Sequence, residues 1–173
     1  MAHEIYGEYT DLQEPYGVDE SWLDVTASST IKGDGYRIAQ EISNRMKSEL
    51  GITVSIGVSF NKIFAKLGSD YKKPDAITTM YEDEFKSKAW VLPASDLLYV
   101  GRSTTQKLTR LGIHTIGDLA RTDEYLLESQ LGKMGGILWA FANGFDDSPV
   151  KKENTHAPVK SIGNSTTTPR DLE

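Results

Sequence analysis

The chain has 173 residues, of which 38% are apolar, and a formal net charge of −6. This length allows one domain or two small ones, and the apolar content suffices for packed cores. There is no cysteine, so disulfides and cysteine-bound zinc or iron are excluded. No apolar run is long enough to span a bilayer, and the first residues do not resemble a signal peptide, so we expect a cytoplasmic protein.

The negative charge is unevenly distributed along the chain. Residues 4–24 carry acidic charges only, whereas residues 62–73 carry four lysines and one acid, Asp70. The overall acidity argues, taken alone, against a nucleic-acid-binding domain, because such domains are typically basic. Because lysines are concentrated in residues 62–73, the net negative charge alone does not exclude a nucleic-acid-binding domain.

The first stretch, up to Tyr16, is predicted to be the last turns of a helix. Ile5, Tyr9 and Leu12 recur at roughly helical intervals, and Pro15 would end the helix. Because this helix has no start signal, we expect the sequence to open inside a larger domain.

Residues 16–26 are predicted to form two short β-strands that fold back near Ser21, because β-branched and aromatic residues are frequent there. Asp19 and Glu20 are adjacent carboxylates within this hairpin, and only one of them can point fully into a single cleft. In one interpretation, Asp19 binds a divalent cation at a strand end while Glu20 adds negative potential or binds the far side of the metal. The alternative is an acidic strand edge that discourages sheet-to-sheet pairing, since a hard cation usually takes more than two oxygens.

Residues 26–80 are predicted to alternate helices and strands. The expected elements are a polar loop (26–33), a helix capped by Asp34 and closed by Gly51, a strand (53–60), a helix from Asn61 to the stop at Pro74, and a strand (76–80). This order predicts an α+β fold in which helices are layered on a sheet.

The sequence after about Tyr81 predicts helices only. A short charged helix (82–90) and a turn at Leu92-Pro93 are followed by two glycine turns that each lead into a helix. The first turn is Val100-Gly101, and the second spans residues 131–136 before a helix over 137–143. Backbone N–H groups at such helix starts can point at a phosphate without much net positive charge.

The two glycine turns resemble tandem helix-hairpin-helix elements, which hold the backbone of duplex DNA without reading its sequence. In the alternative interpretation, each glycine is only a turn residue in a small helical bundle. Two such turns in tandem favour DNA binding. The candidate DNA-binding residues are Val100, Gly101, Arg102, Ser103, Lys107, Gly132 and Lys133.

Taken together, these motifs resemble the Y family of translesion DNA polymerases, and in particular its bacterial members. The resemblance rests on Gly-Val-Asp-Glu-Ser-Trp-Leu-Asp-Val-Thr (17–26), on Ser-Ile-Gly-Val-Ser-Phe-Asn-Lys-Ile-Phe-Ala-Lys-Leu-Gly-Ser-Asp-Tyr-Lys-Lys-Pro-Asp (55–75), and on the two hairpins that follow. It covers nearly the whole chain, with the motifs in the family's order.

The resemblance implies a domain organisation and a set of functional residues. Residues 1–80 would be a partial polymerase palm, 81–147 an all-α thumb, and 148–173 the linker and the start of a little finger domain whose first strand is 160–163. Asp19 and Glu20 would be two of the three palm carboxylates that bind two catalytic Mg²⁺ ions, and Lys73 would contact the triphosphate of the incoming nucleotide. The implied partners are primer–template duplex DNA, a dNTP and a sliding clamp.

The sequence departs from the family pattern in ways that limit this interpretation. The family's catalytic aspartate on the first palm strand and its fingers domain are not found, and Asp75 and Ala76 replace the usual asparagine and glycine. We therefore expect a fragment that is inactive alone and at most a weak duplex binder. The competing hypothesis is a non-catalytic helix-hairpin-helix module with an α+β scaffold.

Four further charged residues have no predicted chemical role. Lys62 and Lys66 lie four apart on one helix face and are expected to be solvated, with at most a minor contribution to the field around DNA or nucleotide. For Asp24 and Asp70 we expect buried or capping hydrogen bonds.

Overall fold

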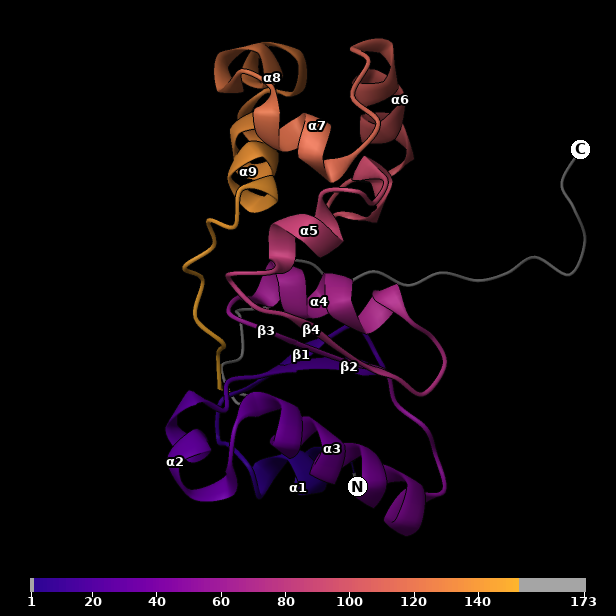
Figure 1. Ribbon diagram of the computed structural model, residues 1–173, viewed down its shortest axis with the longest axis vertical. Coiled ribbons are helices and arrows are strands. Elements are labelled where there is room, and N and C mark those ends of the chain that lie inside the picture. Colours follow the sequence, from indigo (N-terminus) through magenta and orange to yellow (C-terminus); the bar gives the residue numbers. More distant parts are fainter. Residues whose placement is uncertain (1, 153–173) are drawn as a thin grey trace, which may run out of the picture.

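The structure is a computed structural model and describes residues 2–152. The expected end of the linker and the first strand of the little finger (160–163) lie outside the described residues. The molecule is elongated (Figure 1): the strands lie between the layer of α1, α2 and α3 and the helix α4, and α5 to α9 stack beyond α4. This arrangement confirms the predicted α+β class.

The first half of the chain forms four strands and four α-helices. In order, they are α1 (Ala2–Gly7), β1 (Gln13–Tyr16), β2 (Glu20–Leu23), the 3₁₀ turn η1 (Thr26–Ser28), α2 (Ser29–Lys32), α3 (Gly35–Arg45), the π-helical turn η2 (Met46–Leu50), β3 (Ile56–Ser59), α4 (Lys62–Tyr71) and β4 (Ile77–Met80).

The N-terminal hairpin corrects two predictions. It turns at residues 17–19, where Gly17 adopts a left-handed backbone with φ of 71°, and not at Ser21, which pairs with Pro15 inside the hairpin. Pro15 does not end a helix but lies in β1, where it is tolerated because both strands are edges of a two-stranded sheet.

A further correction concerns the expected polar loop over 26–33, which contains the short helical segments η1 and α2. Hydroxyl groups stabilise these turns, since Ser29 donates to the Thr26 carbonyl at 2.8 Å and Thr30 to that of Ala27 at 3.5 Å. A polar composition therefore does not exclude helix where Ser and Thr side chains can bond to the preceding turn.

The two long helices of this half begin where the sequence predicts. The Asp34 side chain accepts a hydrogen bond from the Arg37 N–H at 2.8 Å and caps α3, and the Asn61 side chain accepts one from the Phe64 N–H at 2.9 Å and caps α4. Gly51, with φ of 69°, caps the π-helical turn η2, which follows α3 directly, so the helical run ends at the residue expected.

The strands pair two by two. β1 and β2 are antiparallel, with Tyr16 opposite Glu20, whereas β3 and β4 are parallel, with Ile56 opposite Ile77. Helix α3 packs on one side of β3 and β4 and helix α4 on the other. This crossover arrangement suits a parallel pair, which requires a helix between its strands.

Close packing between β3 and α4 depends on glycine. A Cβ atom added at Gly57 would lie 1.9 Å from the Ala65 carbonyl oxygen, and one at Gly68 would lie 3.1 Å from the Gly57 Cα. Helix α4 can therefore approach the strand only because neither residue has a side chain.

The second half of the chain forms a stack of short helices. They are α5 (Phe85–Ala89), the 3₁₀ turn η3 (Ala94–Asp96), α6 (Arg102–Arg110), α7 (Ile116–Arg121), α8 (Glu124–Leu131) and α9 (Lys133–Ala142). A capping box between Thr115 and Asp118 starts α7.

Buried apolar side chains of residues 2–152 form two hydrophobic clusters. The smaller one packs α1 against α3 around Ile38 and Ile42. The larger one joins Phe64 of α4 to Phe85 of α5, with ring centroids 4.8 Å apart, and continues to Leu138 of α9. The α+β half and the helical stack therefore share one core. Helix α4 is held by β3 and β4 on one side and by the helical stack on the other.

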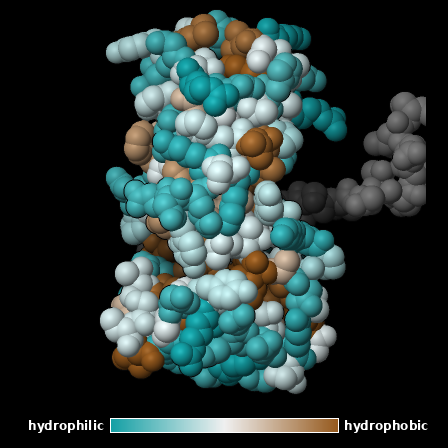
Figure 2. Space-filling view, viewed as in Figure 1, coloured by the Kyte–Doolittle hydropathy of each residue, from teal (hydrophilic) through white to brown (hydrophobic). Residues whose placement is uncertain are grey.

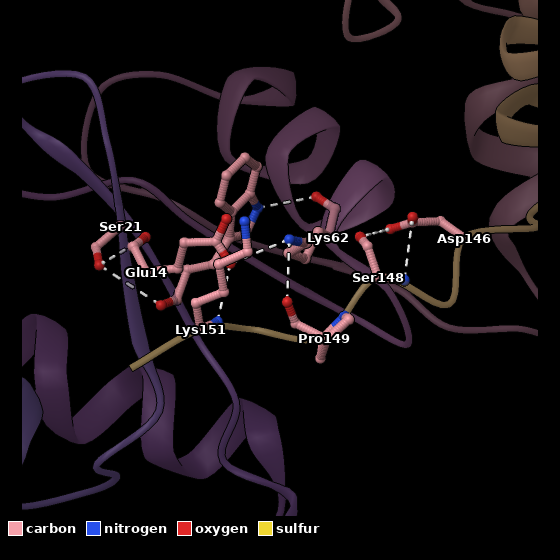
Figure 3. Close-up of polar contacts among 8 residues, drawn as sticks. Glu14, Ser21, Lys62, Asp146, Ser148, Pro149 and Lys151 are labelled. Carbon is pink, nitrogen blue, oxygen red and sulfur yellow. Dashed lines mark hydrogen bonds and ion pairs between the residues drawn. The ribbon is translucent and has the colours of Figure 1, made fainter. Parts of the chain in front are cut away.

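After α9 the chain returns to the α+β half as an extended segment, residues 144–152, which we call the strap. The Asn61 side-chain amide donates to the Gly144 carbonyl at 3.0 Å, and the Lys62 ammonium donates to the Pro149 carbonyl at 3.3 Å. The Lys151 N–H donates to the Glu14 carboxylate at 2.9 Å (Figure 3). These bonds are made to the strap's backbone, so they hold its path largely independently of its side chains.

The Gly57 contact predicts a stability effect. Gly57→Ala should lower the free energy of unfolding by about 3 kcal/mol or more, because the added methyl group collides with the α4 backbone and the helix must move. Urea unfolding followed by circular dichroism measures the loss. Gly7→Ala is the matched control: its methyl group would meet only the end of the Gln13 side chain, at 3.4 Å, so a change within about 0.5 kcal/mol is expected. Equal effects of the two substitutions would contradict the packing argument.

The strap contact predicts a pH dependence. Burial alone would raise the pKa of Glu14, but its bonds to the Lys151 N–H and the Lys62 ammonium outweigh burial and hold the pKa below its ordinary value. The interaction is therefore complete above the ordinary pKa of a glutamate and is lost as the pH falls through the lowered one. In an NMR titration, the Lys151 amide resonance should move only at pH values below that ordinary pKa.

Two variants check the assignment of this titration. Lys62→Met should move the midpoint of the Lys151 amide upward, because it removes a positive charge 3.1 Å from the Glu14 carboxylate. Glu14→Gln should abolish the transition altogether. An unchanged midpoint in Lys62→Met would show that the ion pair does not control the strap.

Candidate functional site

The two carboxylates singled out in the sequence occupy different environments. Asp19 is exposed in the turn at the end of the hairpin, directly before β2. Glu20 is the first residue of β2, and its side chain is 35% exposed and turned towards α4, where it meets Lys66. Asp19 was expected at a strand end, but the structure places it in the turn between β1 and β2.

Glu20 opens a chain of four alternating charges. The Lys66 ammonium lies 2.8 Å from the Glu20 carboxylate and 2.7 Å from that of Asp70, and the Lys73 ammonium lies 2.6 Å from the other Asp70 oxygen. Residues 66 and 70 are one turn apart on α4, a spacing that favours a Lys–Asp pair. The structure thus links Glu20 to Lys73, two of the predicted site residues, through two residues that had been given no role. We call this network the ionic chain.

The ionic chain corrects the prediction for Lys66. Its side chain is 17% exposed, so it is not a solvated surface lysine. Burial alone would lower the pKa of Lys66, but the bonds to Asp70 and Glu20 outweigh burial and raise it. Burial would likewise raise the pKa of Asp70, and the bonds to Lys66 and Lys73 lower it. Lys66 and Asp70 are therefore both charged at neutral pH.

Lys62 also differs from the prediction of a solvated side chain. It is 13% exposed and pairs with Glu14 at the strap (Figure 3). Asp24 accepts a hydrogen bond from the Thr26 N–H at 3.0 Å, but it does not cap η1, whose N-cap residue is Val25. Lys62 and Lys66 lie on the same helix, and they form ion pairs with different carboxylates, Glu14 and Glu20.

The fit of these residues to a metal ion can be tested by the chemistry of the donors. Carboxylate oxygens are the ligands that Mg²⁺ prefers, so Asp19 and Glu20 are suitable in kind. They are too few, however: within residues 2–152, no three His, Asp or Glu side chains are grouped closely enough to hold a metal ion. Asp19 and Glu20 can therefore contribute to a magnesium site, but the described part of the chain does not complete one.

The first glycine turn has the form that the sequence predicts. Gly101 precedes α6 with an extended backbone, and a Cβ atom there would meet nothing within 4 Å. Arg102, Ser103 and Lys107 are exposed, whereas Val100 is only 7% exposed and belongs to the core. Helix α6 thus presents polar side chains to solvent. Val100, directly before Gly101, anchors the turn in the core.

The second glycine turn requires a correction. Helix α9 begins at Lys133, not at Ile137, so Gly135 and Gly136 lie inside the helix. A Cβ atom at Gly135 would lie 2.2 Å from the Leu127 carbonyl oxygen, which shows that this glycine allows α8 and α9 to pack closely. Gly132, with φ of 65°, is the turn residue, and Lys133 beside it is exposed.

Sequence reasoning missed Lys66, Asp70 and Glu14 as parts of a network. The Lys-x-x-x-Asp spacing of residues 66 and 70 was a usable signal for one ion pair on a helix. The contacts of Glu20 with Lys66 and of Glu14 with Lys62 had no local signal, because their partners are 46 and 48 residues apart.

Family models match both halves of the chain. The model described as the impB/mucB/samB family matches residues 1–70, and that described as the DNA polymerase-iota thumb domain matches residues 95–146. The chain belongs to the Y family of DNA polymerases.

Curated relatives of this chain include DNA polymerase IV proteins of several organisms. DNA polymerase IV of Acetivibrio thermocellus is 58% identical over 171 residues, which are 99% of this chain and 43% of the relative. DNA polymerase IV of Pseudomonas aeruginosa is 39% identical over 172 residues, which are 99% of this chain and 48% of the relative. The chain therefore spans less than half the length of these relatives.

Solved structures agree with the sequence comparison. A Y-family DNA polymerase chimera superposes with a TM-score of 0.77 at 27% identity, over 87% of this chain and 44% of the chimera. A DinB family error-prone DNA polymerase from Sulfolobus solfataricus gives 0.75 at 26% identity, over 87% and 47%. Of the helices in the described residues, none is both long and apolar enough to cross a membrane.

Proposed function

We propose that the chain is the palm-and-thumb part of a translesion DNA polymerase, which transfers a nucleotidyl group from a dNTP to a primer 3′-hydroxyl. The ionic chain carries this proposal, because it brings Glu20 and Lys73 into one network from separate elements of the fold. The 58% identity to a DNA polymerase IV supports it. Residues 1–80 would then be palm, 81–147 thumb, and the described residues from 148 the start of the linker.

In this proposal the acidic and the basic palm residues have different roles. Asp19 and Glu20 would hold magnesium, and the bound metal would supply a lowered pKa at the primer hydroxyl and neutralise charge on the leaving pyrophosphate. Lys73 would place an ammonium group against the triphosphate, where negative charge increases as the bond breaks. Its side chain is 53% exposed, which leaves it accessible to a ligand.

The thumb would hold duplex DNA by its backbone. The exposed Arg102 and Lys133 are the first residues of α6 and α9, two helices of nine and ten residues, and the exposed Lys107 lies in the last turn of α6. The N–H groups of such helix starts and the adjacent cations suit phosphate oxygens. This mode of binding explains how an acidic chain could bind DNA, because only a few local cations are required.

A segment exchange tests the polymerase function. In DNA polymerase IV of Acetivibrio thermocellus, the 171 matching residues are replaced by this chain, and the hybrid is expected to extend a primer with dNTPs and Mg²⁺. Asp19→Ala in the hybrid should lower the extension rate by about a thousandfold, the scale of losing a pre-organised electrostatic group. Asp24→Asn, which keeps an acceptor for the Thr26 N–H, should leave the rate nearly unchanged.

The chain on its own is the negative control and is expected not to extend the primer, because its described residues supply only part of a metal site. A folded hybrid that binds DNA but is inactive, beside an active relative, would contradict the polymerase proposal. That result would favour the non-catalytic duplex-binding module.

The thumb assignment predicts a salt-dependent effect on binding. Replacing Arg102, Lys107 and Lys133 together by alanine should weaken binding to blunt duplex DNA about tenfold or more at low salt. The slope of log K against log salt should become shallower by about 1 for each lost phosphate contact. Arg37→Ala on α3, at the other end of the molecule in Figure 1, is the control and should change neither quantity. Equal loss in both variants would disprove a localised thumb surface.

A further inference from the structure

Lys66 contacts one of the two carboxylate oxygens of Glu20. Its ammonium group lies 2.8 Å from the Glu20 carboxylate, in contact with an oxygen that a cation would use. The neighbouring α4 residues Ile63, Phe64 and Leu67 are buried in the shared core, so the helix that carries Lys66 is fixed. This cation is therefore placed by the fold and is not a mobile surface group.

Asp70 gives the same ammonium group a second partner. Lys66 lies 2.7 Å from Asp70, so it could release Glu20 without becoming an unpaired, largely buried charge. Such an uncompensated charge would be costly, and Asp70 removes that cost. Asp70 in turn shares its carboxylate with Lys73, 2.6 Å away. The strength with which Asp70 attracts Lys66 thus depends on whether Lys73 is also bound there.

We propose that Lys66 is an internal counter-ion that competes with divalent cations for Glu20 and withdraws onto Asp70 when a cation binds. The inference rests on the proposed function for the assignment of Asp19 and Glu20 as metal ligands. Lys66 is a positioning residue in this scheme, since it acts through Glu20. An anion such as a nucleotide phosphate that draws Lys73 away from Asp70 strengthens the hold of Asp70 on Lys66, and so favours cation uptake at Glu20.

Manganese binding to the chain itself tests the competition. Mn²⁺ is titrated into the isotopically labelled chain, and broadening of the backbone amides of residues 18–21 yields an apparent Kd. Lys66→Met should tighten binding about tenfold, within the usual range for coupling between neighbouring sites. Lys62→Met is the matched control, because it removes the same kind of ion pair from the same helix at Glu14, and it should leave the Kd unchanged. Lys66→Gln replaces Lys66→Met if the latter does not fold.

Two further variants test the withdrawal onto Asp70. Lys73→Met should tighten Mn²⁺ binding, because Asp70 is then left to Lys66 alone, whereas Lys72→Met, a change of equal charge at the adjacent residue, should have a smaller effect. Asp70→Asn should weaken binding, because Lys66 loses its alternative partner.

The possible outcomes separate the inference from the proposed function. Broadening at residues 18–21 with the same Kd in the wild type and Lys66→Met would overturn the role of Lys66 and leave the metal assignment standing. No broadening there in any variant would overturn the metal assignment and the competition together. Equal effects of Lys73→Met and Lys72→Met would show that Lys73 acts only through its charge. The proposed coupling of Lys73 to Lys66 through Asp70 would then be overturned.

Discussion

The close approach of α4 to β3 is the contact on which the rest of the structure depends. Gly57 and Gly68 allow the helix to lie directly on the strand, and Phe64 extends from the same helix into the core shared with the helical stack. One helix therefore positions the strap through Lys62, the ionic chain through Lys66 and Asp70, and the junction between the two halves. A shift of this helix would disturb all three together, because protein cores transmit strain and do not absorb it locally.

The charged side chains of this protein form specific ion pairs, which the net charge does not describe. A net charge of −6 suggests a poor match for phosphate, yet the lysines of α4 are matched one by one to acids from the N-terminal hairpin and from the helix itself. Such pairing keeps partly buried lysines charged. The exposed Arg102 and Lys133 are cations that can meet an external anion, and Lys73 remains 53% exposed although it is paired with Asp70. The distribution of charge, more than its sum, is what bears on function.

Sequence reasoning succeeded where the signal is local. The capping residues Asp34 and Asn61, the closing Gly51 and the turn before α6 were all predictable, because each acts within one turn of its own position. It failed for the hairpin turn, placed near Ser21, and for the start of α9, placed at Ile137. Pro15 is tolerated inside the hairpin because β1 is an edge strand, and Gly135 lies inside α9 because it allows α8 to pack closely.

The sequence by itself determined the α+β class, the family and the identity of the residues that could carry chemistry, because these follow from local patterns and from motif order. Only the tertiary structure decided which of those residues meet. Glu20 and Lys66, 46 residues apart, become partners because β2 and α4 are packed together, and Glu14 meets Lys151, 137 residues away, because the chain returns from α9 as the strap. Contacts of such separation leave no periodic trace along a chain, since they depend on how whole elements pack.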